Sequence, residues 1–369
     1  MRVLIDGYFE VNFGDDLFFK TLIERYPSTT WILNTSNKKY KNIFSKEIRK
    51  ITLGVSLYKK ILLRTKIKKS VIEFSNYRDC DMLVIIGGSI FMDKPELKKI
   101  YEDREKLIRY FHDNGKKVFI LGANFGPVRD ESFIEYHKGV YKLCTDICFR
   151  DQYSYNLFNS MSNVRLAPDI IFQLKSEEFK KNKKTVGFSL IDLENRKDLK
   201  QYSDEYENKI RELIMLYLDN DYSVSLFSFC DIEGDMKAIH KIIQKLEESY
   251  IKRIKILNYT GDIVNFTKEF QCVENIIGTR FHSVILSQVF KQGLFPLIYS
   301  DKTYNVLKDI NLDKHYKYIK DIENLKVKDV YNITKTNKLY ESNVFMKSEE
   351  HFMVLDKYLE TMNEKSYEN

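Results

Sequence analysis

Four side chains that could hold an anion follow apolar runs typical of buried strands. Arg280 and His282 follow the run ENIIG, Arg150 follows DICF, and Lys302 comes shortly after LFPLIY. In open α/β sheets, ligands bind beyond the carboxyl ends of the strands. Two guanidinium groups, an imidazole and an ammonium group at such sheet edges therefore indicate an anion-binding site.

The position of Arg280 raises a question of charge. The sequence predicts that a helix follows ENIIG, with Thr279 as its cap, Phe281 on its apolar face and Gly293 at its end. The start of a helix already carries partial positive charge, so a cation there is unfavourable. A bound anion would offset the repulsion and accept hydrogen bonds from the first backbone N–H groups.

Each of these residues also has a common structural interpretation. An arginine after a strand usually makes a surface salt bridge, and a single histidine is usually a satisfied polar group. Lys302, in YSDKTY, resembles a turn lysine. Only the joint placement of the four residues favours a binding site.

The elements that must position these residues alternate between apolar strands and amphipathic helices. Strand-like runs begin near residues 2, 81, 116, 146 and 164, and again near 185, 222, 254, 274 and 294. This rhythm indicates parallel sheets covered by helices on both faces. The sequence predicts two doubly wound, Rossmann-like α/β domains that face a cleft, over residues 1–173 and 184–335. A further amphipathic helix, over 345–366, is expected to pack back on the body.

Composition is consistent with this organisation. A chain of 369 residues is longer than one core usually supports, and 43% hydrophobic with 31% charged residues is typical of folded soluble proteins. The apolar runs are shorter than the ~18 residues of a membrane span, and the start MRVLIDGYF does not resemble a signal peptide. Five scattered cysteines indicate free, buried thiols and predict a cytoplasmic location.

The net charge of +7 has two interpretations. Lysine-rich runs are usually solvated faces, but they can also attract an anionic surface or substrate. The segment SLYKKILLRTKIKKS, residues 56–70, mixes apolar and basic residues as an interfacial segment does, which suggests peripheral contact with an anionic membrane at its inner face. Nucleic-acid binding is not expected, because the chain has no zinc-finger spacing, recognition-helix signature or RNA-binding aromatic motif.

Seven stretches occur in order over residues 1–310, and they are GYFEVNFGDD (7–16), VIIGGSIF (84–91), LGANFGP (121–127), CFRDQYSYNLF (148–158), APDIIF (167–172), IIGTRFHSVILS (276–287) and YSDKTYNVL (299–307). Together they resemble motifs of the polysaccharide pyruvyl transferase family. Ser89 departs from the pattern, since many relatives carry a third glycine there.

The resemblance implies a fold similar to that of two-domain GT-B glycosyltransferases. It also implies transfer of a pyruvyl group from phosphoenolpyruvate to a sugar, as a ketal across two hydroxyls, with no metal or other cofactor as a rule. Relatives act on cell-wall or exopolysaccharide precursors, often lipid-linked. Arg150, Arg280, Phe281, His282 and Lys302 match the family's phosphoenolpyruvate-binding positions, in agreement with the anion site inferred from the residues themselves.

The N-terminal half is expected to face the acceptor sugar. Asn12, Asp15 and Asn124 can hydrogen-bond hydroxyls, and Gly87 and Gly88 let a ligand approach the backbone. The alternative is that Asp15 only caps its helix and the glycines only form turns.

Two further acidic features of the sequence bear on the site. The acids of DGYFEVNFGDD lack the regular oxygen spacing of a calcium loop, so no metal site is expected. Asp169, in APDII, either orients a basic residue across the cleft or stabilises a turn.

In the expected mechanism, His282 is the general acid and base, since an imidazole titrates near neutrality. Arg280, Arg150 and Lys302 hold the anion and stabilise the leaving phosphate. The rival enzyme is a GT-B glycosyltransferase with a nucleotide-sugar donor, for which Glu269 or Asp262 would have to bind the ribose. A binding module that keeps the anion site without turnover is the third alternative.

Overall fold

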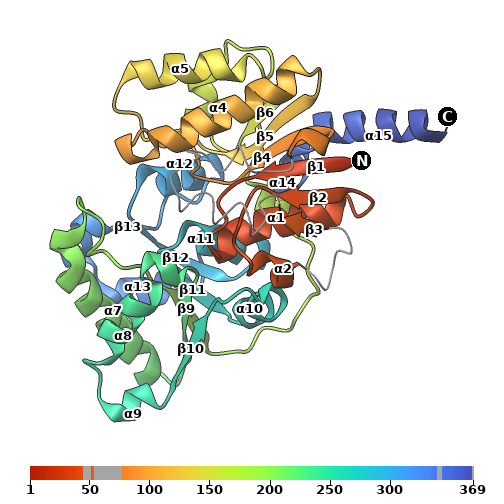
Figure 1. The fold of residues 1–369 in the computed structure, drawn as a ribbon. Coiled ribbons are helices and arrows are strands. Elements are labelled where there is room, and N and C mark those ends of the chain that lie inside the picture. Colours follow the sequence, from red (N-terminus) through yellow and green to blue (C-terminus); the bar gives the residue numbers. More distant parts are fainter. Residues whose placement is uncertain (45–50, 54–76, 339–342, 368–369) are drawn as a thin grey trace, which may run out of the picture. The chain divides into compact units, whose positions relative to one another are not determined.

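The computed structural model describes residues 1–44, 51–53, 77–338 and 343–367 (Figure 1). The basic segment 56–70, for which membrane contact was predicted, lies outside these residues. Within the part of the chain that is described, no helix is both long and apolar enough to cross a membrane. All five cysteines carry free thiols, and all but the half-buried Cys272 are buried, as predicted.

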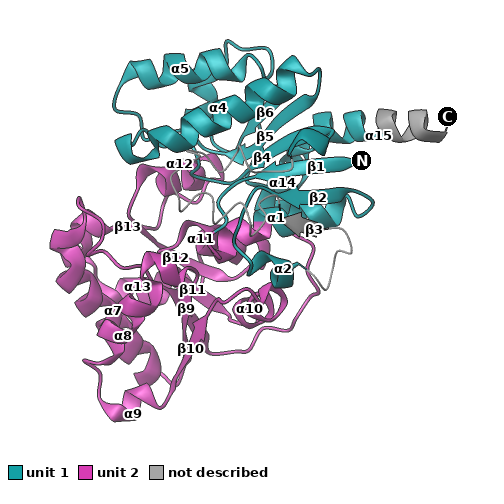
Figure 2. Cartoon of the chain, in the orientation of Figure 1, with its two compact units in different colours: residues 1–9, 18–173, 342–369 teal, residues 10–17, 174–341 magenta. Residues whose placement is uncertain are grey.

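The chain forms two compact units, coloured separately in Figure 2. Unit 1 contains residues 1–9, 18–173 and 342–369, and unit 2 contains 10–17 and 174–341. The sequence pattern assigned 10–17 to the N-terminal domain, but these residues pack with unit 2.

Long-range contacts explain the placement of residues 10–17. The Phe13 N–H donates to the Phe229 carbonyl at 2.9 Å, and the centres of the Phe13 and Phe266 rings lie 4.5 Å apart. The Tyr259 hydroxyl donates to Asp16 Oδ2 at 2.7 Å. Aromatic packing with residues of unit 2 thus holds this segment, although it follows the first strand of unit 1 directly.

Unit 1 is built on a parallel sheet of seven strands in the order β3-β2-β1-β4-β5-β6-β7. Every residue of β4 is buried, as expected for a strand covered on both faces. The strands are β1 (Arg2–Asp6), β2 (Thr30–Leu33), β3 (Ile51–Leu53), β4 (Met82–Ile86), β5 (Lys117–Ala123), β6 (Asp146–Phe149) and β7 (Val164–Leu166).

Helix α4 of unit 1 buries one face, whereas α1 is buried on all sides over residues 13–23. In α4 the buried residues Tyr101, Arg104, Ile108 and Phe111 recur at helical spacing, and α4 packs on β5 and beside α5 (Figure 1). The helices are α1 (Phe13–Arg25), which begins in unit 2, α2 (Tyr40–Ile43), α4 (Lys98–Asp113), α5 (Glu131–Tyr141), α6 (Gln152–Phe158), α14 (Asn343–Ser348) and α15 (Met353–Tyr367).

Two helices replace the single helix expected over 345–366. A short 3-10 turn, Glu349–His351, separates α14 from α15. Asp356 of α15 accepts hydrogen bonds from the Arg25 guanidinium, at 2.5 Å from Nη2, and from the Tyr26 hydroxyl at 2.7 Å. These contacts hold the first turn of α15 against the end of α1 within unit 1.

Unit 2 is built on a parallel sheet of six strands in the order β10-β9-β8-β11-β12-β13. Its strands are β8 (Thr185–Ser189), β9 (Ser223–Ser228), β10 (Ile254–Asn258), β11 (Asn275–Gly278), β12 (Gly293–Ile298) and β13 (Lys317–Tyr318). Its helices are α7 (Ser203–Asp219), α8 (Asp235–Ile243), α9 (Glu248–Ile251), α10 (Ile263–Gln271), α11 (Phe281–Val289), α12 (Asp301–Asp309) and α13 (Val327–Thr334).

Both sheets have the strand order of a doubly wound Rossmann fold, which confirms the predicted fold class. In this topology the direction of winding reverses between the first and fourth strands of each sheet, and ligands bind at that point. The reversal lies between β1 and β4 in unit 1, where Gly87 and Gly88 follow β4. It lies between β8 and β11 in unit 2, where Arg280 follows β11.

Candidate functional site

Hydrogen bonds at the reversal point of unit 2 fix the backbone around Arg280. The Ser189 hydroxyl, at the end of β8, accepts the N–H groups of Thr279 at 3.1 Å and Arg280 at 3.2 Å. Thr279 does not cap α11 as predicted, because its hydroxyl is hydrogen-bonded to the Tyr206 hydroxyl at 3.0 Å. Arg280 itself is the residue before the helix, in an extended conformation and without a side-chain cap.

The guanidinium of Arg280 is clamped by Asp235. Its Nε lies 2.9 Å from Asp235 Oδ2, and Nη2 bonds to Oδ1. The same carboxylate accepts the backbone N–H groups of Phe229 and Cys230, each at 3.0 Å. The side chain of Asp235 is fully buried and that of Arg280 is 8% exposed. This clamp fixes the direction of the guanidinium.

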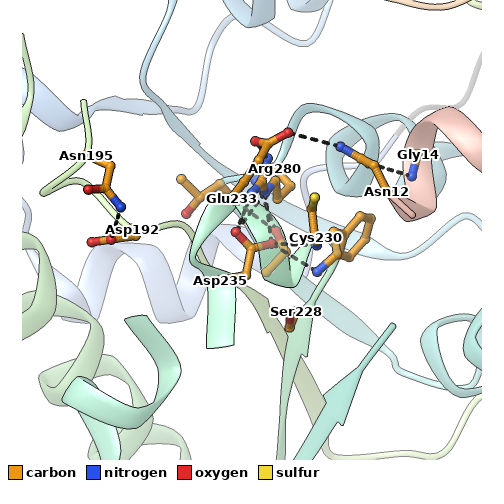
Figure 3. A network of polar contacts seen from close by, with 12 residues as sticks. Asn12, Gly14, Asp192, Asn195, Ser228, Cys230, Glu233, Asp235 and Arg280 are labelled. Carbon is orange, nitrogen blue, oxygen red and sulfur yellow. Dashed lines mark hydrogen bonds and ion pairs between the residues drawn. The ribbon is translucent and has the colours of Figure 1, made fainter. Parts of the chain in front are cut away.

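Glu233 provides a second carboxylate for Arg280, shown with the first in Figure 3. Its Oε2 lies 2.5 Å from Arg280 Nη1 and 3.4 Å from Arg196 Nη2. Its Oε1 accepts from Asn12 Nδ2 at 3.4 Å. Burial alone would raise the pKa of Glu233, but the charges of Arg280, Arg196 and Lys302 outweigh it and lower that pKa.

These two carboxylates offset the unfavourable position of a cation, Arg280, at the start of α11. Burial opposes the charge on Arg280, but Asp235 and Glu233 raise its pKa well above the ordinary value of an arginine. The cation is tolerated there because two anionic side chains accompany it.

His282 lies against the start of α1. A Cβ added to Gly14 would lie 1.7 Å from His282 Nδ1, so only glycine leaves room for the imidazole. Asn12 Oδ1 accepts the Gly14 N–H at 3.1 Å and so caps this helix. Asp15 lies in the first turn of α1, not at the cap where the sequence pattern put it. Asn12 and Asp15 are both buried.

Lys302 and Phe281 are also in contact in unit 2. Lys302 Nζ lies 4.5 Å from the centre of the Phe281 ring, a cation–π distance. Lys302 belongs to the first turn of α12 and not to an isolated turn. The guanidinium of Arg196 lies 4.8 Å from the Tyr299 ring, just before α12. Unit 2 therefore gathers Arg280, Phe281, His282 and Lys302 of the predicted site residues, together with Asn12.

Asp15 also belongs to unit 2, and unit 1 gathers Gly87, Gly88 and Asn124 of the predicted residues around Arg150. Arg150 Nη1 lies 2.8 Å from Asp169 Oδ2, and Nη2 lies 2.7 Å from Asn124 Oδ1. A Cβ on Gly88 would lie 2.5 Å from Arg150 Nη2, and Gly87 has a φ of 150°. Asp169 also accepts the Ile171 N–H at 2.9 Å, so it both orients a basic residue of its own unit and stabilises a turn.

Sequence reasoning missed Arg196, Glu233 and Asp235. The two acids lie in FCDIEGDM, directly after β9, and so follow a strand as the predicted residues do. The glycine between the two acids, Gly234, is a further signal in the sequence. Its φ is 91° and an added Cβ would lie 2.8 Å from the Cβ of Asp192, so this turn requires glycine. Arg196 lies in the loop after β8. The surrounding sequence is rich in charged residues, so Arg196 resembles an ordinary surface arginine.

Solved structures with low sequence identity share this fold. S. aureus MnaA, solved with UDP, is 12% identical with a TM-score of 0.61, over 97% of this chain and 96% of that chain. The UDP-GlcNAc 2-epimerase of Methanocaldococcus jannaschii is 13% identical with a TM-score of 0.59, over 97% and 100%. Anabaena Alr3699/HepE, in complex with UDP and glucose, is 10% identical with a TM-score of 0.55, over 99% and 100%. The likeness shows a GT-B-like fold.

The sequence itself identifies the family. The model of the family described as polysaccharide pyruvyl transferase matches residues 12–301, which is most of the chain. The match begins at Asn12 and includes Arg150, the carboxylates of Glu233 and Asp235, and Arg280 with His282. The chain therefore belongs to the polysaccharide pyruvyl transferase family.

Proposed function

We propose that this protein transfers a pyruvyl group from phosphoenolpyruvate to a sugar of a cell-surface polysaccharide or of its lipid-linked precursor, forming a pyruvate ketal. The main support is the short segment Arg280–His282 at the reversal point of unit 2, with Lys302 against Phe281. The ends of the neighbouring strands β11 and β12 thus present two cations and an imidazole.

The donor has two anionic groups, a phosphate and a carboxylate, and needs more than one cation. Arg280 and Lys302 bind these groups in the proposal, Phe281 supports Lys302, and Arg150 is the donor-binding cation of unit 1. Arginine suits this role because its planar fork binds oxyanions through two hydrogen bonds.

His282 is the proposed general acid. It donates a proton to the methylene carbon of phosphoenolpyruvate, which becomes a methyl group and leaves a cationic centre at the ester carbon. A sugar hydroxyl adds to that carbon and gives its proton to His282, which is thereby restored. The bond between that carbon and the phosphate oxygen then breaks, the second hydroxyl closes the ketal, and its proton leaves on the phosphate. Arg280 stabilises the charge on the departing phosphate.

The acceptor-binding residues remain those predicted from the sequence. Asn12, Asp15 and Asn124 would bind sugar hydroxyls, and Gly87 and Gly88 would admit the sugar to the backbone. Asn12 already donates to Glu233, so an acceptor hydroxyl near Asn12 would lie close to Arg280 in unit 2, while Asn124 accepts from Arg150 within unit 1. No metal or cofactor is part of this proposal.

A nucleotide-sugar donor is the second candidate, favoured by the fold, since MnaA and Alr3699/HepE were solved with UDP. The acids that it would need for the ribose have other roles here. Asp262 caps α10 through the Asn265 N–H at 3.1 Å, and Glu269 pairs with Lys255 at 2.6 Å. The first candidate is therefore the better supported.

The deciding experiment measures phosphate release from phosphoenolpyruvate with a panel of free and lipid-linked glycans, and analyses the products by mass. We expect release that depends on the acceptor, and its loss in His282→Ala but not in the control His240→Ala, whose side chain is exposed. Binding of phosphoenolpyruvate without release would indicate a binding module. Stabilisation by UDP-sugars alone would favour the rival enzyme.

A further inference from the structure

One oxygen of Glu233 bridges two arginines. Oε2 contacts Arg280 Nη1 at 2.5 Å and Arg196 Nη2 at 3.4 Å. An oxygen atom shared by two guanidinium groups is the arrangement that a bound phosphate or carboxylate oxygen adopts. Lys302 adds to the positive charge around this carboxylate, since its charge also lowers the pKa of Glu233.

The two carboxylates on Arg280 differ in how firmly they are held. Asp235 has a fully buried side chain and accepts two backbone N–H groups besides its pair of contacts with Arg280. The side chain of Glu233 is 28% exposed, and its neighbour Ile232 is 72% exposed, so this turn faces water. Rotation of the Glu233 side chain would carry its carboxylate into solvent without moving the backbone that holds Asp235.

We propose that Glu233 is a displaceable counter-ion, which occupies the position of a donor oxyanion between Arg196 and Arg280 and leaves when the donor binds. The proposal also makes Arg196 a further donor-binding residue and Asp235 a positioning residue. It rests on the proposed function for the identity of the donor. The exchange keeps both guanidinium groups paired, because a phosphate dianion replaces the carboxylate that leaves.

The cation–π contact of Arg196 with Tyr299 supports its role. Its guanidinium lies 4.8 Å from the Tyr299 ring, which limits the directions in which it can point, and its side chain remains 29% exposed. A partly exposed arginine that already rests against a ring can receive a ligand from solvent at little cost in conformational freedom.

The test measures binding of inorganic phosphate and of phosphoenolpyruvate to the full chain by calorimetry. Glu233→Gln keeps the shape of the side chain and removes its charge. We expect this variant to bind both anions about tenfold more tightly than the wild type, because they no longer compete with a carboxylate. Arg196→Ala is expected to bind both about tenfold more weakly.

Two control variants separate this local effect from the general field of the protein. Asp231→Asn removes the same charge from an exposed position two residues away, and Lys197→Ala removes a cation next to Arg196 in its loop. Neither should change binding more than about twofold, since exposed charges are screened. Equal or weaker anion binding in Glu233→Gln would overturn the proposal and make Glu233 a second fixed support of Arg280.

Failure of the counter-ion proposal can be distinguished from failure of the proposed pyruvyl transfer. Tighter phosphate binding in Glu233→Gln, without acceptor-dependent phosphate release in the wild type, would uphold the counter-ion and reject the pyruvyl transfer. Acceptor-dependent release with unchanged anion binding in Glu233→Gln would reject the counter-ion alone.

Discussion

Gly14 and His282 lie in direct contact in unit 2, where a side chain on Gly14 would overlap the imidazole. The Gly14 N–H is also held by Asn12, so the backbone at the start of α1 is fixed against the ring. A residue 268 positions away in sequence thereby limits the orientations that His282 can adopt.

Replacement of Gly14 should therefore impair catalysis. In Gly14→Ala the methyl group would lie 1.7 Å from the unshifted Nδ1, so either the imidazole or the segment 10–17 must move. We expect kcat for phosphate release to fall about a hundredfold, the order of effect that a misplaced catalytic group produces. Steady-state kinetics with phosphoenolpyruvate and an acceptor measures this.

Gly139→Ala is the matched control. Gly139 lies in α5, and a Cβ added there meets no atom within 4 Å. This variant should keep full activity and gain about 0.5–1 kcal/mol of stability, as alanine does over glycine in a helix. If Gly14→Ala keeps wild-type kcat, the contact with Gly14 does not orient the catalytic imidazole.

The clamp on Arg280 should contribute to stability as well as to geometry. Asp235→Asn leaves a buried guanidinium with one carboxylate fewer, and loss of one partner from a buried ion pair costs about 3–5 kcal/mol. Urea denaturation followed by fluorescence should show this loss. In Asp231→Asn, an exposed change in the same turn, the free energy of unfolding should stay within about 0.5 kcal/mol of the wild type. A similar small effect in Asp235→Asn would contradict the clamp.

The sequence was informative where a local pattern determines the structure. Long apolar runs such as those of β4 and β5 identified buried strands and, with the helices between them, the doubly wound fold. The four-residue run of β2 is too short to stand out. Arg280 and His282 were recognised because a strand end is visible in the sequence.

The remaining features depend on contacts between distant residues. Asp235 lies 45 residues from Arg280 in sequence, and nothing near either residue shows that they pair. The segment 10–17 follows β1, yet the rings of Phe229 and Phe266 draw Phe13 into unit 2. A single sequence indicates where elements end, but the pairing of charges and rings across a fold is decided by tertiary packing.

Arg150 and Asp169 should behave as a coupled pair in unit 1. Both side chains are fully buried, with Nη1 2.8 Å from Oδ2. We expect Arg150→Met and Asp169→Leu each to cost about 3–5 kcal/mol, because each leaves one buried charge without its partner. The double variant should cost clearly less than the sum. Urea denaturation of all four proteins gives the coupling free energy, and simple additivity would show that the pair contributes no interaction of its own.

Acid should destabilise unit 1 through His137. Burial lowers the pKa of this imidazole from 6.5 to about 4, and its Nδ1–H donates to the Phe133 carbonyl at 2.8 Å. The unfolded chain binds a proton near pH 6.5 while the folded chain does not. Stability is therefore complete above that pH and falls between pH 6.5 and 4, by about 1.4 kcal/mol per pH unit for one group.

The comparison of variants isolates this contribution from those of other groups. His137→Gln removes the titration, so the difference in unfolding free energy between wild type and variant should shrink by about 1.4 kcal/mol for each unit that the pH falls from 6.5 toward 4. The exposed His240→Gln should leave the pH slope of the wild type unchanged. Urea denaturation at pH 7, 6 and 5 measures both slopes. A constant difference between wild type and His137→Gln would mean that His137 takes up its proton in the folded chain as readily as in the unfolded one, and that its burial among aromatic rings does not exclude the charge.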